Sequence, residues 1–312
     1  MPLPFILGGL TLAVAGYGLK KSFDASDTAD EINIVIKKAN DLKEEAIKKA
    51  EPVESDCKNA LMRLGEKKFH VQSYSMSSFV KEFNQLKGRE FVVKVADMQD
   101  LYKQVLSAQN LFSQPNTNGM TDESIIEKML IGYGSLGVSS FITAMMMGGE
   151  LVTAILGFFS TSKMEEKLDD AKAYYSQVEA ASKKADVMID DLRSVEKMAK
   201  LFTRQITKFD ALFFSLAQEA IATMKKHHYD TSHYNQKEKD QLCVTVSTLM
   251  TLSAFLKVSI MDKQHQKLTE KAKNALNLMR KQMDSLENGN YSLRGIRFRQ
   301  AQLEDLRDDK TS

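Results

Sequence analysis

Residues 163–228 decide the fold class, and they read KMEEKLDDAKAYYSQVEAASKKADVMIDDLRSVEKMAKLFTRQITKFDALFFSLAQEAIATMKKHH. Apolar side chains recur there at alternating steps of three and four residues, which is the period of an α-helix. Neither glycine nor proline occurs in residues 158–288, so no local signal breaks a helix. An unbroken helix over this stretch would reach roughly 100 Å. The apolar seam comprises Met164, Leu168, Ala171, Tyr175, Val178, Ala185, Ile189 and Leu192 and, after a shift, Ala199, Phe202, Ile206, Phe209, Phe213 and Leu216.

A second long helix is expected downstream. The polar residues 229–236 would end the first helix, and residues 237–287 would form the next one, which Asn288 and Gly289 would stop. Within it, residues 242–256, LCVTVSTLMTLSAFL, carry no charge. Fifteen residues are too few to cross a bilayer as a helix, which favours a buried helix packed against others. The β-branched residues leave a local strand as an alternative.

The chain upstream also has a helical pattern. Residues 22–50 are highly charged and have a loose apolar side, and Pro52 is expected to open a further helix over residues 53–87 that continues past Gly65. Residues 113–122, SQPNTNGMTD, are the clearest loop. In chain order, the predicted organisation is an N-terminal apolar segment (1–19), a helical region (20–112), a loop with the start of the next helix (113–128), a central apolar segment (129–162), a long helical coiled-coil region (163–288) and a charged tail (289–312).

Composition excludes several classes of function. The net charge of the 312-residue chain is only +2, so whole-molecule electrostatics give no reason to expect nucleic acid as a partner. Cys57 and Cys243 lie far apart and no CxxC pair occurs, which argues against a disulfide framework and a cysteine zinc site. We therefore expect no cofactor and no structural metal.

Glycine is concentrated in the two apolar segments, which hold 10 of the 15 glycines. Glycine weakens a water-exposed helix by about 1 kcal/mol per residue, whereas in lipid small residues let helix backbones approach closely. We therefore predict that these segments interact with a membrane. The glycines are Gly8, Gly9, Gly16 and Gly18 in the first segment, and Gly132, Gly134, Gly137, Gly148, Gly149 and Gly157 in the second.

The N-terminal segment, MPLPFILGGLTLAVAGYGL, carries no side-chain charge before the Lys20-Lys21 pair. As a helix, its 19 residues would span roughly 28 Å, close to the hydrocarbon thickness of a bilayer. The lysine pair favours an orientation with the following chain inside the cell. Two alternatives remain, a signal peptide cleaved near Ala13 and a buried core helix. Ala13 joins Gly8, Gly9 and Gly16 as a predicted insertion or packing residue.

The central segment, MLIGYGSLGVSSFITAMMMGGELVTAILGFFSTS, has Glu150 as its single charge. Residues 129–149 could span a bilayer once, or the whole segment could enter it as a re-entrant hairpin that turns at residues 148–150. Ser140, Ala144 and Gly148 recur every four positions and would form a close-packing helix face. A soluble core helix that tolerates small residues is the alternative. The predicted insertion and packing residues are Gly132, Gly134, Gly137, Ser140, Ala144, Gly148, Gly149, Glu150 and Gly157.

Three patterns suggest chemistry, and none is strong. Residues 132–137 match GxGxxG, but no alternating strand and helix pattern surrounds them, and a dinucleotide site needs that context. Ser135 nearly fits a nucleophile elbow, although Tyr133 occupies the first glycine position. Residues 225–234, KKHHYDTSHY, bring three histidines close to an aspartate, which could bind zinc or respond to pH near 6, but a polar turn explains the same residues. We therefore expect a non-catalytic protein.

Two resemblances follow from these stretches. PLPFILGG…YGLKKSFDA at residues 2–25, NALMRLGEKK at 59–68 and SSFVKEFNQLK at 77–87 resemble a group of poorly characterised bacterial proteins that join an N-terminal apolar segment to long coiled-coil helices. The layout of one glycine-rich apolar segment between long helices is similar to that of the α-helical pore-forming toxins of the cytolysin A type. Neither resemblance carries over a residue-level site.

The sequence thus predicts an all-α protein, an elongated helical bundle or antiparallel coiled coil with two apolar glycine-rich segments that interact with a membrane. We expect it to oligomerise in a bilayer and permeabilise or remodel it. The alternative is an anchored coiled-coil subunit whose long helices recruit a protein partner, such as a membrane GTPase or a defence complex. The resemblance implies a bacterial inner membrane with most of the chain cytoplasmic, and a soluble form that later inserts is left open.

Overall fold

The fold is seen in a computed structural model, which describes residues 25–89, 103, 106, 168–258, 260 and 270–288. This part of the chain is all-α, as predicted, and its only extended pairing is an isolated bridge between Lys87 and Asp230. The elements are α1 (Ala25–His70), a π-helical turn η1 (Val71–Met76), α2 (Ser77–Phe83), α7 (Leu168–Lys226), a 3-10 turn η4 (Thr231–His233), α8 (Gln236–Lys257) and α9 (Glu270–Glu287).

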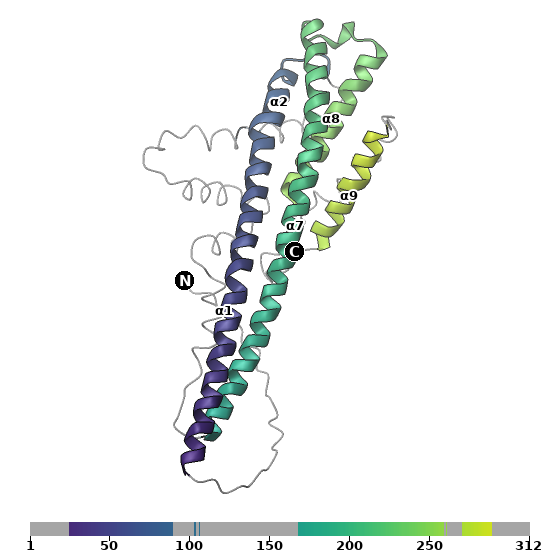
Figure 1. The fold of residues 1–312 in the computed structure, drawn as a ribbon. Helices are drawn as coiled ribbons and strands as arrows, with labels where there is room; N and C mark the ends of the chain where they lie inside the picture. Colours follow the sequence, from purple (N-terminus) through teal and green to yellow (C-terminus); the bar gives the residue numbers. More distant parts are fainter. Residues whose placement is uncertain are drawn as a thin grey trace, which may run out of the picture.

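The two longest helices, α1 and α7, lie side by side and run parallel (Figure 1). Near the start of both helices, the Tyr174 hydroxyl donates to Asn40 Oδ1 at 3.5 Å. Near the other end, Lys225 Nζ lies 3.5 Å from Glu82 Oε1 of α2. Residue numbers therefore rise together along both helices. The chain between Arg89 and Leu168 connects opposite ends of this pair.

The sequence analysis allowed an antiparallel arrangement of the helices, and α7 and α8 have that orientation, whereas α1 and α7 do not. Gln241 Nε2 donates to Glu219 Oε2 at 2.6 Å, and Thr245 Oγ1 donates to the Leu216 carbonyl at 3.4 Å. Along this pair one residue number rises as the other falls. The short connection between α7 and α8 makes them an antiparallel hairpin, whereas a long connection leaves the orientation of α1 and α7 open.

The prediction that Pro52 opens a new helix is wrong, because Pro52 lies inside the continuous helix α1. Proline removes one backbone donor, so the Lys48 carbonyl loses its helical partner. Lys48 and Pro52 are both exposed, so water can hydrate that carbonyl. Burial on the opposite side, at Ala50 and Val53, holds the helix together across the proline.

Downstream, the predicted breaks are partly confirmed. The interruption at residues 229–236 is present, and α9 ends at Glu287 as expected. The single helix predicted over residues 237–287 is wrong, because α8 ends at Lys257 and Val258 adopts an extended conformation. The uncharged stretch 242–256 is helical and largely buried, so the local strand is not formed there.

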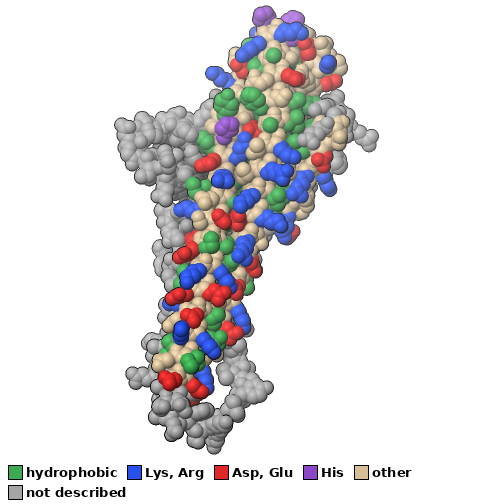
Figure 2. All heavy atoms as spheres, viewed as in Figure 1, with side chains coloured by type: hydrophobic (Ala, Val, Ile, Leu, Met, Phe, Trp, Pro, Cys, Tyr) green, Lys and Arg blue, Asp and Glu red, His purple; other side chains and the backbone are tan. Residues whose placement is uncertain are grey.

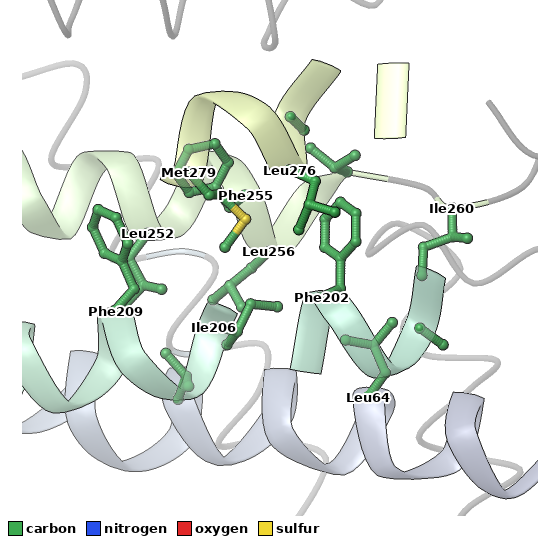
Figure 3. Packing of buried hydrophobic residues seen from close by; sticks show 14 of the residues in the cluster. Leu64, Phe202, Ile206, Phe209, Leu252, Phe255, Leu256, Ile260, Leu276 and Met279 are labelled. Carbon is green, nitrogen blue, oxygen red and sulfur yellow. The ribbon is translucent and has the colours of Figure 1, made fainter. Parts of the chain in front are cut away.

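The core lies where α1, α7, α8 and α9 meet (Figure 3). Phe209 of α7 meets Phe255 of α8 edge to face, with ring centroids 5.8 Å apart. Most of the predicted seam of α7 is buried, which confirms that periodicity located the core face of this helix. The buried seam residues are Ala171, Val178, Ala185, Ile189, Leu192, Ala199, Phe202, Ile206, Phe209 and Phe213.

Candidate functional site

All of the site residues predicted from the sequence lie outside the described residues. These are Gly8, Gly9, Ala13 and Gly16 of the N-terminal segment, and Gly132, Gly134, Gly137, Ser140, Ala144, Gly148, Gly149, Glu150 and Gly157 of the central segment. Within the described ranges, no helix combines the length and the apolar character that a membrane span requires. The structure therefore bears on these segments only through the points at which they join the described helices.

The two helices that follow the apolar segments start at the same end of the molecule. Helix α1 begins at Ala25, shortly after residues 1–19, and α7 begins at Leu168, shortly after residues 129–162. Because α1 and α7 run parallel, their N-terminal ends lie together at one end of the pair (Figure 1). We call this end the base. The opposite end, formed by α2 and the turn between α7 and α8, we call the head.

The head begins at the C-terminal end of α7. This helix ends without a glycine. His228 and Tyr229 have φ values of 51° and 59°, the left-handed region that side chains other than glycine rarely adopt. The Tyr229 N–H donates to the Met224 carbonyl at 2.8 Å, and the His228 N–H donates to the Lys225 carbonyl at 3.2 Å. These two bonds form a Schellman motif, which satisfies carbonyls at the end of α7.

The segment after α2 is tied to this turn by backbone and side-chain bonds. The Lys87 N–H donates to the Tyr229 carbonyl at 2.8 Å, and the Tyr229 hydroxyl donates to Glu82. Thr231 Oγ1 donates to the Gly88 carbonyl at 2.8 Å. Gly88 has a φ of +68°, and an added Cβ there would lie 2.5 Å from Thr231 Oγ1. Only glycine fits this position, and together with these hydrogen bonds it holds the backbone of the head in one defined conformation.

The histidines of the head do not form a metal site. His227 Nε2 lies 3.0 Å from Glu238 Oε1, which Lys226 Nζ also contacts at 2.9 Å. Glu238 completes a capping box with Asn235 at the start of α8. The hydrogen bond from His227, followed by those from Lys226 and Asn235, lowers the pKa of Glu238 to about 2. Across the described residues, no group of three or more His, Cys, Asp or Glu side chains could hold a metal ion.

A buried lysine connects α1 to the end of α8. Lys68 is 2% exposed, and its Nζ donates to the Val258 carbonyl at 3.0 Å. Burial lowers the pKa of this amine to about 7. The bond supplies a partner for a carbonyl at the end of α8, where a helix has unsatisfied acceptors. This contact could not be predicted from the sequence, because Lys68 lies in the charged stretch EKK at residues 66–68.

The π-helical turn exposes an aromatic cluster that sequence reasoning also missed. Tyr74 of η1 is 59% exposed and stacks on Phe214 of α7, which is 38% exposed. The His70 ring lies 5.5 Å from the Tyr74 ring. Residues 71–76 contain no glycine or proline, so no local signal in the sequence predicts the turn.

Comparison with known proteins yields no match to a family model, a curated protein or a solved structure.

Proposed function

We propose that this protein is a non-catalytic, membrane-associated helical protein that inserts residues 1–19 and 129–162 into one bilayer and holds its head away from that bilayer. The observation that carries the proposal is the parallel course of α1 and α7, which brings the attachment points of both apolar segments to the base.

The alternative orientation would not serve this function. An antiparallel pair would separate the attachment points by the length of α7, whose 59 residues span roughly 88 Å. The hydrocarbon core of a bilayer is only about 30 Å thick, and the bilayer lies at one end of such a rod. An antiparallel pair would therefore hold one of the two attachment points far from that bilayer. Residues 20–24 and 163–167 are short links, so in the parallel pair both apolar segments start close to the base.

The surface of the helices above the base carries charged side chains that water solvates well. Figure 2 shows Lys, Arg, Asp and Glu side chains interspersed along the visible face. Several of them form pairs one helical turn apart, such as Lys49 with Glu45 at 2.8 Å and Lys183 with Glu179 at 3.0 Å. A surface of mixed charges would not enter the hydrocarbon core. The long helices would therefore project from the membrane as an elongated helical bundle and place the head roughly 80–90 Å from the base.

This arrangement favours a scaffold that recruits a protein partner at a distance from the membrane. A second function, oligomerisation that permeabilises or remodels the bilayer, is favoured by a different observation. The row of Ser140, Ala144 and Gly148 would let inserted helices from neighbouring copies pack closely. The two functions share the insertion step and differ in whether inserted copies open a path for solutes.

Alkaline extraction of membranes tests the insertion step. We expect the full chain to stay with the membrane pellet, versions that lack either residues 1–19 or residues 129–162 to be partly released, and a version that lacks both to be fully released. Release of the full chain by alkali would contradict the proposal. Circular dichroism of each version controls for loss of the helical fold.

Fluorescence quenching tests the orientation, and dye release separates the two functions. With Cys57 and Cys243 replaced by alanine, a fluorophore at Asp30→Cys near the base should be quenched by lipid-borne quenchers, and one at Ser232→Cys in the head should not. Equal quenching at both sites would refute a projecting rod. Leakage of dye from liposomes at protein concentrations that saturate binding would establish permeabilisation.

A further inference from the structure

Two exposed aromatic rings lie in contact on the surface formed by η1 and α7. Among the described residues, large hydrophobic side chains are exposed at Ile34, Tyr74, Val187 and Phe214. The Tyr74 and Phe214 ring centroids lie 6.4 Å apart and the ring planes differ by 15°. In Figure 2, hydrophobic side chains and a histidine lie together on the upper part of the visible face. Exposed, preordered aromatic rings are typical of the centre of a binding surface.

The surroundings of these rings are almost free of charge. Between Lys67 and Lys81, the residues that are not buried are His70, Ser73, Tyr74 and Ser78. On α7, Ala211, Phe214 and Gln218 recur at steps of three and four residues, so they share one face. In a chain in which 27% of the residues are charged, an exposed surface of this size without charged side chains is unusual. We call this surface the aromatic strip, which comprises His70, Tyr74, Ser78, Ala211, Phe214 and Gln218.

The π-helical turn is the backbone feature that presents this strip. Val71, Gln72, Ser75 and Met76 of the turn are buried, and Tyr74 is left on the outside. Ser73 Oγ donates to the Phe69 carbonyl at 2.9 Å and Ser78 Oγ donates to the Ser75 carbonyl at 3.1 Å. Side-chain hydroxyls thus supply donors to carbonyls around the turn. Single π-helical turns inside α-helices occur often at functional sites.

The rim of the strip is basic. Lys81 and Lys208 are exposed, and the Lys225 side chain is 57% exposed. Two nearby carboxylates are occupied within the protein, whereas Glu66, one helical turn before His70, is exposed. Asp210 binds Lys67 at 2.8 Å with 9% of its side chain exposed, and Glu82 accepts from the Tyr229 hydroxyl and lies beside Lys225. Lys225 is paired with Glu82, so the net positive charge of the rim rests on the exposed Lys81 and Lys208 against the one exposed carboxylate of Glu66, and it would complement an acidic partner.

We infer that the aromatic strip docks an acidic amphipathic helix of a partner protein. The distance from Ala211 to Gln218 is roughly 10 Å along α7, which matches the spacing of three anchors at i, i+3 or i+4, and i+7 on a bound helix. Apolar anchors would contact Tyr74 and Phe214, and flanking carboxylates would face the basic rim. The inference specifies the kind of partner that the proposed scaffold would recruit.

Two other occupants fit less well. A stable dimer buries about 800 Å² on each partner and uses roughly 20–30 residues a side, whereas the strip provides six. A lipid surface would have to reach the strip from the base, and Tyr74 lies roughly 70 Å along the helix from Ala25. Both alternatives remain outcomes of the test below.

The test measures binding of fluorescent helical peptides to the full chain in mild detergent. The probe is an amphipathic peptide of roughly 18 residues, about five turns, with leucine and phenylalanine anchors and flanking glutamates. One matched peptide carries lysines in place of the glutamates, and another carries alanines in place of the anchors. We expect saturable binding of the acidic peptide that weakens with salt, and little binding of either matched peptide.

Variants of the strip locate the site. Tyr74→Ala and Phe214→Ala should each weaken binding of the acidic peptide by about tenfold or more. Val187→Ala removes an exposed hydrophobic side chain elsewhere on α7 and should leave binding unchanged. Reversal of the rim by Lys81→Glu with Lys208→Glu should shift preference toward the basic peptide. Circular dichroism controls for folding of each variant.

Four results of the peptide, variant and light-scattering measurements would overturn the inference. They are absence of saturable binding, equal binding of the acidic and basic peptides, no effect of Phe214→Ala, and a dimer in light scattering that Phe214→Ala dissociates. Liposome binding that depends on Tyr74 and Phe214 would also refute it, in favour of a lipid occupant. The peptide assay uses no bilayer, so its failure leaves membrane insertion standing, and failed insertion leaves the docking result standing.

Discussion

At the scale of single residues, buried polar groups hold the helices together at places that the sequence does not mark. Lys68 is the clearest case, because its amine reaches the Val258 carbonyl across the core. Val258 is also where α8 ends in an extended conformation. A contact between residues 190 positions apart therefore accompanies a helix end that no glycine or proline marks. Sequence reasoning placed a continuous helix there for this reason.

Lys68 should also make stability depend on pH. The folded state lowers its pKa from 10.5 to about 7, so between these values the unfolded chain binds a proton that the folded chain does not. Stability from this group therefore rises as pH increases from about 7 to 10.5, by at most about 1.4 kcal/mol per pH unit. We expect Lys68→Met to reduce the increase in the free energy of unfolding between pH 7 and pH 9.

Denaturant unfolding followed by circular dichroism at several pH values measures this effect. Lys208→Met serves as the control, because it removes an exposed lysine from α7. The decisive quantity is the difference between wild type and variant, since other groups titrate equally in both. If Lys68→Met and wild type show parallel pH profiles, the buried amine does not titrate in this range.

At the scale of elements, hydrophobic periodicity identified the buried faces of the helices better than it identified the residues at which the helices end. The seam of α7 and its polar interruption after Lys226 follow from local sequence, because apolar spacing and turn residues act over a few positions. The continuation of α1 through Pro52 and the π-helical turn depend on packing against α7. Tertiary burial can compensate for a poor local signal, and a single-sequence pattern does not report that burial.

Replacement of the proline tests whether α1 is continuous. Alanine is about 3 kcal/mol better than proline inside a helix. If Pro52 lies in the interior of α1, Pro52→Ala restores a donor to the exposed Lys48 carbonyl and should stabilise the protein by about 1–3 kcal/mol. If Pro52 instead opened a separate helix, where proline is favourable, the same change would be neutral or destabilising. Thermal unfolding of the two proteins distinguishes these outcomes.

At the scale of the whole molecule, the direction of α1 relative to α7 determines the proposed function, and it could not be predicted from the sequence. Hydrophobic periodicity identifies a face but carries no direction along the helix axis. The connection between Arg89 and Leu168 is long enough to join the helices in either orientation. Only contacts between distant residues, such as Asn40 with Tyr174, define the orientation.

Cross-linking tests this orientation directly. With Cys57 and Cys243 replaced by alanine, we expect a short bifunctional maleimide to join Asn40→Cys to Tyr174→Cys within one chain, because these side chains meet near the base. The matched pair Asn40→Cys with Lys225→Cys should not cross-link, since Lys225 lies beside Glu82 at the head. The reverse pattern would mean that α1 and α7 run antiparallel. The two apolar segments would then start at opposite ends of the rod, and insertion of both from one end into a single bilayer would no longer follow from the fold.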